Sequence, residues 1–479
     1  MPEVPVLFNT PVYQNIPEEG LSEMSALMID GYVTELPQMG QPATVKRPGI
    51  ASFADTSNSG SRVDGTFYWQ TQDIDVAVCN GSIYSITSAG VVATLGTDKM
   101  QTGTRVQFVE RGDNLYMVNG GSIVKIDGTL TVTALTITGI VDTQACSIAS
   151  INKRLVVART GSDRMYYTDA NSDTFNGTTD SFVANSNPDD ATRIEEYRGL
   201  LLVFGAQSIE MWQDTGSQYF DFQRDPAYIL KKGCIASGTV KFAEGYWYYY
   251  DADRRCVRWS GAGIPEPLST PYDRVIQGFE KVSAATSDIY RIAGHVFYVT
   301  QFPTADKTLV YDITRNEWHE WSYWNQTTAS HERFLGQTYE YVSAWNKHLV
   351  GGRNNGKVGS MSLTTYQDWG NTIRTVRRTG HISHNTLMKK KSKWLKFKVQ
   401  KGYGSYTAEN KFTIRWKDNN GDWGNEVLIG LGYTGEYEFF ETLRRQGTYY
   451  SRQYEFVHTH NSKFALFNGA EEIILLNRS

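Results

Sequence analysis

Short apolar segments separated by polar turns recur along the chain, and apolar and polar residues alternate within each segment. The stretch from Asn114 to Gly128, NLYMVNGGSIVKIDG, is a clear example: an apolar segment, a glycine turn, a second apolar segment and a second glycine turn. A period of two predicts β-strands, and the pair Asn119-Gly120 favours the tight turn of a hairpin. We therefore expect this stretch to be a β-hairpin.

Similar hairpins recur seven times, with starts near residues 76, 115, 155, 201, 246, 296 and 349. This spacing lies in the range of propeller and solenoid repeats. Each copy has a preceding apolar segment, and several have a following one, so the repeating unit is a four-stranded meander. The pattern predicts an all-β chain with a β-propeller of seven four-stranded blades, because a ring of sheets protects its edges. A large β-sandwich is the alternative, since it also shows strands at regular spacing.

The repeat does not extend to either end of the chain. Residues 1–60 form an irregular segment that contains Arg47-Pro48-Gly49, and this segment could supply a strand that closes the ring or could lie across it. Residues 61–370 carry the predicted propeller. Residues 371–479 contain four or five strand candidates with alternating polarity, which predicts a separate C-terminal β-sandwich-like domain.

The charge balance limits the partners of the chain. A formal net charge of -4 gives no overall attraction to nucleic acid or to an anionic membrane, so any such contact must be local. The first residues, MPEVPVLFNT, lack the pattern of a signal peptide, and no run approaches the ~18 apolar residues of a membrane span. We expect a soluble chain that is made in the cytosol and does not insert into a membrane.

Cysteine and histidine patterns point to neither a metal nor a cofactor. Cys79, Cys146, Cys234 and Cys256 are far apart in the sequence, which favours free thiols. The sequence has no P-loop, nucleophile elbow, dinucleotide fingerprint or HExxH motif. We expect no cofactor, no metal site and no catalytic residues.

A lysine-rich stretch, MKKKSKWLKFK, is the sharpest charge feature of the sequence. In a β-strand the lysines would lie on one face and the apolar residues on the other. Such a face could contact DNA phosphates or an acidic neighbouring subunit. Alternatively it is a solvated strand edge on which lysines discourage aggregation. The candidate basic face consists of Lys389, Lys390, Lys391, Lys393, Lys396, Lys398, Arg377 and Arg378.

Clusters of aromatic residues allow two interpretations. They either fill the space between neighbouring blades or form a stacking surface for sugars or for a partner protein. The candidates are Trp247 in YWYYYD and Trp318, Trp321 and Trp324 in EWHEWSYW.

The order of these parts resembles the tail hub or nozzle proteins of short-tailed bacteriophages, also called packaged DNA stabilisation proteins. The residues that carry the resemblance are RPGI at Arg47 to Ile50, TLVYDITRNEWHEW at Thr308 to Trp321, and the strands IRWKDNNGDWG and LRRQGTYYSRQYEF. The resemblance implies a homo-hexameric ring below the phage portal and adaptor rings. It implies that this ring extends the channel for packaged double-stranded DNA, helps to retain that DNA and attaches a needle, spikes or fibres.

The resemblance also implies a structural virion protein of the phage tail, assembled in the cytoplasm of the host bacterium and not an enzyme. We expect the wall of the ring channel to be neutral or acidic, because a basic wall would hold the departing genome. The alternative function is a propeller glycosidase or lectin that acts on host-surface glycans, since propellers can hold a carboxylate pair at the mouth of their channel. A WD40-like scaffold is a weaker alternative, because the GH and WD signature is absent.

Overall fold

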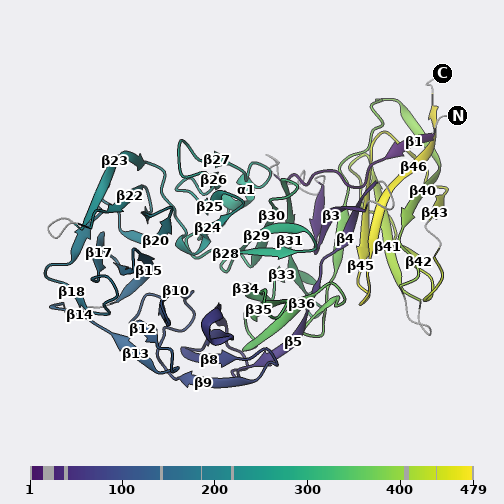
Figure 1. Ribbon diagram of the computed structural model, residues 1–479. Helices are drawn as coiled ribbons and strands as arrows, with labels where there is room; N and C mark the ends of the chain where they lie inside the picture. Colours follow the sequence, from purple (N-terminus) through teal and green to yellow (C-terminus); the bar gives the residue numbers. More distant parts are fainter. Residues whose placement is uncertain are drawn as a thin grey trace.

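The computed structural model describes residues 3–14, 26–36, 41–140, 144–184, 186–216, 221–403, 409–437 and 440–476. Within these ranges the regular structure is almost entirely β-strand, with one α-helix, α1 (Asp273–Gln277). Figure 1 shows a ring of sheets with the C-terminal strands gathered at one side. The prediction of an all-β propeller is confirmed. No helix of the described residues is long and apolar enough to cross a membrane.

Five blades are separate antiparallel sheets of four strands within the described residues. The hairpin Asn114 to Gly128 forms the two middle strands of its blade, as the pattern predicts. The strands of the five blades are β6 (Val63–Trp69), β7 (Ile74–Cys79), β8 (Ser82–Ile86) and β9 (Val92–Gly96); β10 (Gln107–Arg111), β11 (Asn114–Val118), β12 (Ile123–Ile126) and β13 (Val132–Leu135); β15 (Ala145–Ile151), β16 (Arg154–Arg159), β17 (Arg164–Tyr167) and β19 (Ser181–Val183); β20 (Ala191–Tyr197), β21 (Leu200–Gly205), β22 (Ile209–Asp214) and β23 (Phe222–Leu230); β24 (Lys241–Ala243), β25 (Tyr246–Tyr250), β26 (Cys256–Trp259) and β27 (Glu266–Pro267).

Two further four-strand groups belong to larger sheets, so the predicted set of seven separate four-stranded blades differs from the structure. The difference arises because strands from the two ends of the chain add to both groups. One group opens a nine-stranded sheet with β28 (Thr286–Ile292), β29 (His295–Phe302), β30 (Lys307–Asp312) and β31 (Glu317–Glu320). The other lies in a six-stranded sheet with β34 (Gly336–Val342), β35 (Lys347–Gly352), β36 (Lys357–Ser362), β5 (Gly49–Asp55), β37 (Gln367–Asp368) and β38 (Asn371–Thr372).

The propeller closes through β5, a strand from the irregular first segment. β5 runs antiparallel to β36, with Ile50 opposite Met361, and parallel to β37. Strands distant in sequence therefore share one sheet. A Cβ atom at Gly49 would lie 2.4 Å from the carbonyl oxygen of Gln367, so the close approach of β5 and β37 requires glycine.

The C-terminal part is a sandwich of two sheets. The first continues the nine-stranded sheet, from β31 through β2 (Leu27–Ile29) and β39 (Thr375–Arg378) to β45 (Arg452–His458), β41 (Lys411–Asp418) and β42 (Val427–Gly430). The second contains β3 (Gly31–Leu36), β4 (Gln41–Lys46), β46 (Ala465–Leu476), β40 (Lys389–Val399) and β43 (Phe440–Arg444), with β1 (Glu3–Val6) on β46 and β44 (Thr448–Tyr449) on β40. Side chains of both sheets form the core between them, among them Phe397, Phe412 and Phe456.

The first 60 residues are shared between the two parts, with β1 to β4 in or beside the sandwich and β5 in the propeller. The domain boundaries at residues 60 and 370 stay predictions. Short elements complete the described structure: β14 (Ile137–Thr138) with β18 (Phe175–Asn176), β32 (Ser322–Asn325) with β33 (Ser330–Arg333), and the 3-10 helices η3 (Gln70–Gln72) and η4 (Ser237–Thr239).

Candidate interaction face and its supports

Strand β40 places lysines on the outer face of the sandwich. Lys391 and Lys396 are exposed, whereas Leu395 and Phe397 are buried in the core. Simple alternation would put Lys391 and Lys396 on opposite faces. A register shift against β46 between Ser392 and Trp394 adds one residue, and it returns the later lysines to the outer face.

Two of the predicted basic residues do not belong to this face. Lys390 is fully buried, its ammonium group donates to the carbonyl oxygens of Thr386 and Met388 at 2.9 Å each, and burial lowers its pKa. Arg377 is also buried and donates from Nε to the carbonyl oxygen of Phe8 at 2.7 Å; burial lowers its pKa to about 10. The interpretation of both as exposed contacts is wrong, because each occupies an inward position of its strand and stabilises a loop.

The remaining candidates are at least partly exposed, and several have partners within the chain. Arg378 donates from Nη2 to Glu455 at 2.7 Å, and Lys393 donates to Glu472 at 2.8 Å. Lys389 lies exposed at the start of the strand. The ammonium groups of Lys396 and Lys398 lie 4.7 and 5.5 Å from the ring centre of Phe440 on the neighbouring strand β43.

A shallow pocket of about 380 Å³ lies on this face. Lys396, Lys398 and Phe440 form one side, and Glu3 and Gly469 contribute from β1 and β46. The pocket places two lysine cations beside an aromatic ring, an arrangement in which the cations are attracted to the face of the ring.

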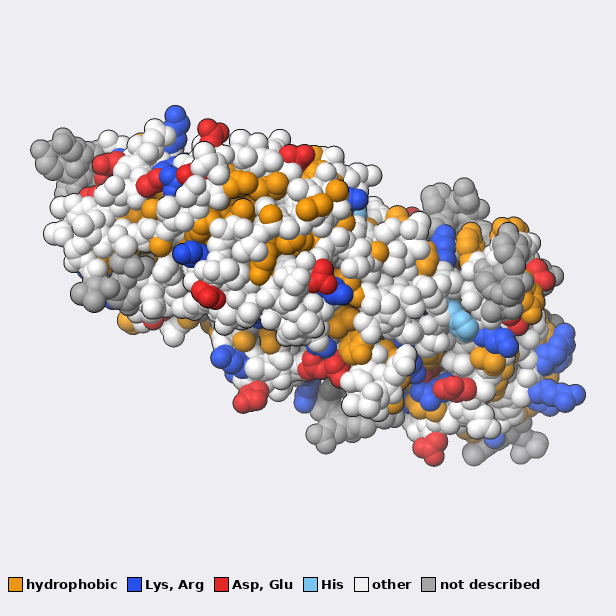
Figure 2. All heavy atoms as spheres, turned by 90° about the horizontal axis from the view of Figure 1, so that it is seen from below, with side chains coloured by type: hydrophobic (Ala, Val, Ile, Leu, Met, Phe, Trp, Pro, Cys, Tyr) orange, Lys and Arg blue, Asp and Glu red, His pale blue; other side chains and the backbone are white. Residues whose placement is uncertain are grey.

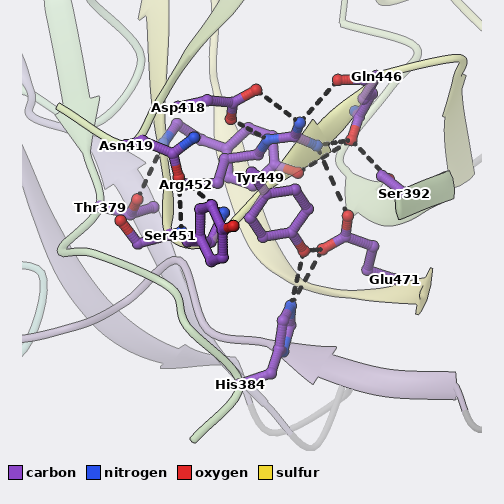
Figure 3. Close-up of polar contacts among 12 residues, drawn as sticks. Thr379, His384, Ser392, Asp418, Asn419, Gln446, Tyr449, Ser451, Arg452 and Glu471 are labelled. Atoms are coloured by element: carbon purple, nitrogen blue, oxygen red, sulfur yellow. Dashed lines mark hydrogen bonds and ion pairs between the residues drawn. The ribbon is translucent and has the colours of Figure 1, made fainter. Parts of the chain in front are cut away.

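A buried polar network contacts the first half of β40 through Ser392, and Figure 3 shows its geometry. Arg452 donates from Nε to Asp418 at 2.7 Å and from Nη2 to the carbonyl oxygen of Gln446 at 2.7 Å. Ser392 of β40 donates to the side-chain oxygen of Gln446 at 3.1 Å. The network therefore joins β40 in one sheet to β41 and β45 in the other, and it fixes the strand that carries the lysines.

Glu471 of β46 extends the same network. It accepts a hydrogen bond from Tyr449 at 2.7 Å, and Nε2 of His384 lies 3.1 Å from the same carboxylate. Burial raises the pKa of Glu471, but hydrogen bonds from His384, Ser392 and Tyr449 outweigh it and hold the pKa below its usual value. Sequence reasoning missed these residues, because they are scattered over almost 90 positions and share no motif.

The first strands of several blades line a pocket of about 250 Å³ at the centre of the propeller. Their charged side chains pair with one another around this pocket. Asp288 accepts from Arg105 at 2.6 Å and lies 3.2 Å from the ammonium group of Lys241. Glu340 accepts from the backbone N–H of Tyr68 at 2.7 Å, and burial raises its pKa to about 7. Asp75 is fully buried, and burial together with the nearby charge of Glu340 raises its pKa well above the usual value. Asp75 and Glu340 form a carboxyl pair, but Asp75 is buried, so a glycan could not contact both members.

Three of the four aromatic candidates are buried in the core, and the interpretation as a stacking or partner surface stays a prediction for the fourth, Trp324. Trp247 is buried between two blades and contacts the rings of Tyr197 and Phe204 at 5.7 and 6.0 Å. Trp318 and Trp321 are buried in further core clusters, so these three tryptophans pack inside the propeller. Trp324 is half-buried, with the guanidinium of Arg374 4.2 Å from its ring centre.

Metal ligands do not gather in the part of the chain that the structure describes, where no group of three or more His, Cys, Asp and Glu side chains could hold an ion. All four cysteines are free thiols.

Comparison with known proteins identifies relatives of this chain. The family model described as bacteriophage P22 Gp10, β-propeller, matches residues 33–366. The tail hub protein gp10 of Salmonella phage P22 is 25% identical over 287 residues, which cover 56% of this chain and 58% of that protein. The alignment thus spans less than two thirds of that relative.

Solved propellers are more distant. Virginiamycin B lyase from Staphylococcus aureus is 10% identical over 66% of this chain and 99% of its own, with a TM-score of 0.46. A streptogramin B lyase is 12% identical over 66% of this chain and 98% of its own, with a TM-score of 0.45. Nothing about the activity of this chain follows from such remote likeness. The family match over residues 33–366 shows that the chain belongs to the bacteriophage P22 Gp10 β-propeller family, the tail hub proteins of short-tailed phages.

Proposed function

We propose that this tail protein assembles into a homo-hexameric ring that extends the DNA channel below the portal and adaptor rings and has no enzymatic activity. The observation that carries the proposal is the family match over the whole propeller. In the assembled particle the ring helps to retain packaged double-stranded DNA and attaches distal parts such as a needle, spikes or fibres. Assembly takes place in the cytoplasm of the host bacterium, and the protein acts in the virion.

The connection between propeller and sandwich supports a mechanical role. One continuous sheet runs from the blade β28 to β31 into the sandwich through β2 and β39. The fully buried Arg47 adds a second link, because it pairs with Asp30 at 2.7 Å and with Asp368 at 2.6 Å. Two such links let the subunit act as one stiff body when pressurised DNA loads the ring.

The charge of the chain is compatible with a channel that releases DNA. Residues 1–370 contain 41 aspartates and glutamates against 29 lysines and arginines. Acidic side chains do not neutralise DNA phosphates, so they release no counterions from the DNA. An acidic wall therefore does not bind the departing genome. We therefore assign the wall of the DNA channel to the propeller. We do not assign it to the lysine face, the exposed or partly exposed lysines of β40 at positions 389, 391, 393, 396 and 398.

A phage that lacks this protein provides the test. Heads assembled without it should fill with DNA and then lose it, so that the genome becomes sensitive to added DNase. Adding the purified protein should restore protection and the attachment of distal tail parts. Particles that keep their DNA and infect normally without the protein would contradict the proposal.

A further inference from the structure

The outer side of the sandwich sheet that contains β40 is one continuous surface. Antiparallel partners on neighbouring strands point to the same side of a sheet, so the strand register assigns the residues of this surface. Lys396 of β40 lies opposite Ala470 of β46 and Thr442 of β43, and Pro5 of β1 also lies opposite Ala470. The four strands therefore present one open surface, which we call the outer sandwich face.

The outer sandwich face carries a local excess of positive charge. Its cations are Lys389, Lys391, Lys393, Lys396, Lys398 and Arg444. The carboxylates that the register places on it are Glu3 and Glu472. Lys393 pairs with Glu472 at 2.8 Å, whereas the other cations have no carboxylate partner among the described residues. Figure 2 shows lysine and arginine side chains projecting from this end of the molecule. The face therefore attracts anions, although the whole chain has a net charge of -4.

Exposed apolar side chains lie among these cations. Leu7, directly after β1, is 56% exposed, and Phe440 of β43 is 51% exposed. Both line the pocket that also contains Lys396 and Lys398. Leu387, two residues before β40, is 95% exposed. Exposed apolar side chains that are gathered together indicate an interaction site for a protein or a membrane.

We propose that the outer sandwich face binds the anionic surface of a lipid membrane. Headgroup phosphates attract lysines that lie near a membrane, and long lysine side chains keep their ammonium groups among the headgroups while their apolar stems lie deeper. Leu7 and Phe440 would leave water at the same boundary, as apolar side chains of peripheral membrane proteins do. The contact is peripheral, and it does not depend on the proposed ring.

The composition of the face favours a lipid surface over DNA and over a protein partner. A DNA backbone offers phosphates to the lysines, but it offers no apolar surface to Leu7 and Phe440. Protein interfaces are depleted in lysine, whereas lysines dominate this face. An anionic lipid surface matches both the cations and the apolar side chains.

Flotation of the full chain with lipid vesicles tests the proposal. Vesicles of phosphatidylcholine alone are compared with vesicles that contain about one third phosphatidylglycerol, at about 50 and about 500 mM salt. Binding to a double-stranded DNA fragment is measured in parallel. The unaltered chain should bind the vesicles with phosphatidylglycerol only, and high salt should weaken this binding. Absence of binding to these vesicles at low salt overturns the proposal, and binding to DNA alone would assign the face to nucleic acid.

The variant Lys391→Gln/Lys396→Gln removes two cations of the outer sandwich face. Because a lysine near an anionic membrane contributes about fivefold to the affinity, this variant should bind the anionic vesicles about thirtyfold more weakly. Lys99→Gln/Lys281→Gln is the matched control, because it loses the same charge at exposed positions outside the face. The control should bind like the unaltered chain. Equal losses in the two variants would overturn the assignment to this face.

The variant Leu7→Ser/Phe440→Ser distinguishes lipid from DNA, because it leaves the charge of the face unchanged. Both side chains are more than half exposed, so their removal should leave the fold intact, which circular dichroism checks. Binding to the anionic vesicles should weaken about tenfold or more, and binding to DNA should not change. If this variant binds the vesicles as tightly as the unaltered chain does, the proposed lipid contact is wrong.

Discussion

The guanidinium of Arg47 donates two hydrogen bonds to the carboxylate of Asp368, from Nη1 at 3.0 Å and from Nη2 at 2.6 Å. Both residues are buried, and they lie 321 positions apart in the sequence. Arg47 directly precedes Pro48 and the closing strand β5, while Asp368 belongs to β37 on the other side of that strand. The pair therefore fastens the strand that closes the propeller.

Replacing Arg47 by alanine should destabilise the protein strongly. The change leaves the carboxylates of Asp30 and Asp368 buried without their cation, and such a loss costs about 3–5 kcal/mol. Arg258→Ala is the control, because its pair with Glu266 is partly exposed, with side chains 29% and 59% exposed, and its loss should cost at most about 1 kcal/mol. Urea unfolding measures both, and equal losses for the two variants would show that the buried pair does not hold the closure.

Replacing Gly49 by alanine should weaken the same closure by a different route. The new Cβ would lie 2.4 Å from the carbonyl oxygen and 2.5 Å from the nitrogen of Gln367, and backbone atoms cannot move aside as a flexible side chain can. We expect a loss of about 1–3 kcal/mol. Gly380→Ala is the control, since a Cβ at that position would have no neighbouring atom within 4 Å. Hydrogen exchange should accelerate in β5 and β36 of the first variant only; unchanged exchange there would refute the steric argument.

Glu340 should make the protein less stable as the pH rises. Burial raises its pKa to about 7 in the folded state, so between about pH 4.5 and 7 the folded chain binds a proton that the unfolded chain has released. Stability from this group is therefore lost with rising pH across that window. Glu340→Gln keeps an oxygen for the N–H of Tyr68 and has no such titration. Its unfolding free energy should exceed that of the unaltered chain at pH 8 by more than at pH 5, and an identical pH dependence of the two would contradict the assignment.

Glu471 should have the opposite pH dependence. Its folded-state pKa lies below the usual value, so its stabilising effect is present at neutral pH and is lost as the pH falls through the folded-state pKa. Glu471→Gln should lower stability by about 1–3 kcal/mol at pH 7, because a neutral amide is a poorer partner for Arg452 and His384. The unfolding free energy of this variant should also fall less steeply than that of the unaltered chain as the pH is lowered. Glu426→Gln, at an exposed carboxylate, serves as the control.

The sequence predicts the repeating part of the fold well, because period-two alternation and glycine turns are local signals. The hairpin from Asn114 to Gly128 appears where the pattern places it. The sequence alone could not predict how the first segment closes the propeller. The strand β5 and the pair Arg47 and Asp368 depend on contacts between residues about 300 positions apart, for which there is no local signal.

The lysine face was predicted in part. The run of lysines indicates a strand with an exposed basic face, but Lys390 takes an inward position that the charge pattern alone does not reveal. The bulge after Ser392, which returns Lys396 to the outer face, has no signal in the sequence. The polar network around Arg452 was also hidden, because its members come from five separate segments.

The mass of the purified protein in solution tests the central claim most directly. Light scattering at two concentrations, alone and with the neighbouring proteins of the virion, would give the number of copies in the assembly. The account predicts a mass near six times 54.0 kDa, either alone or induced by a partner ring. A mass of 54.0 kDa under every condition would contradict the ring.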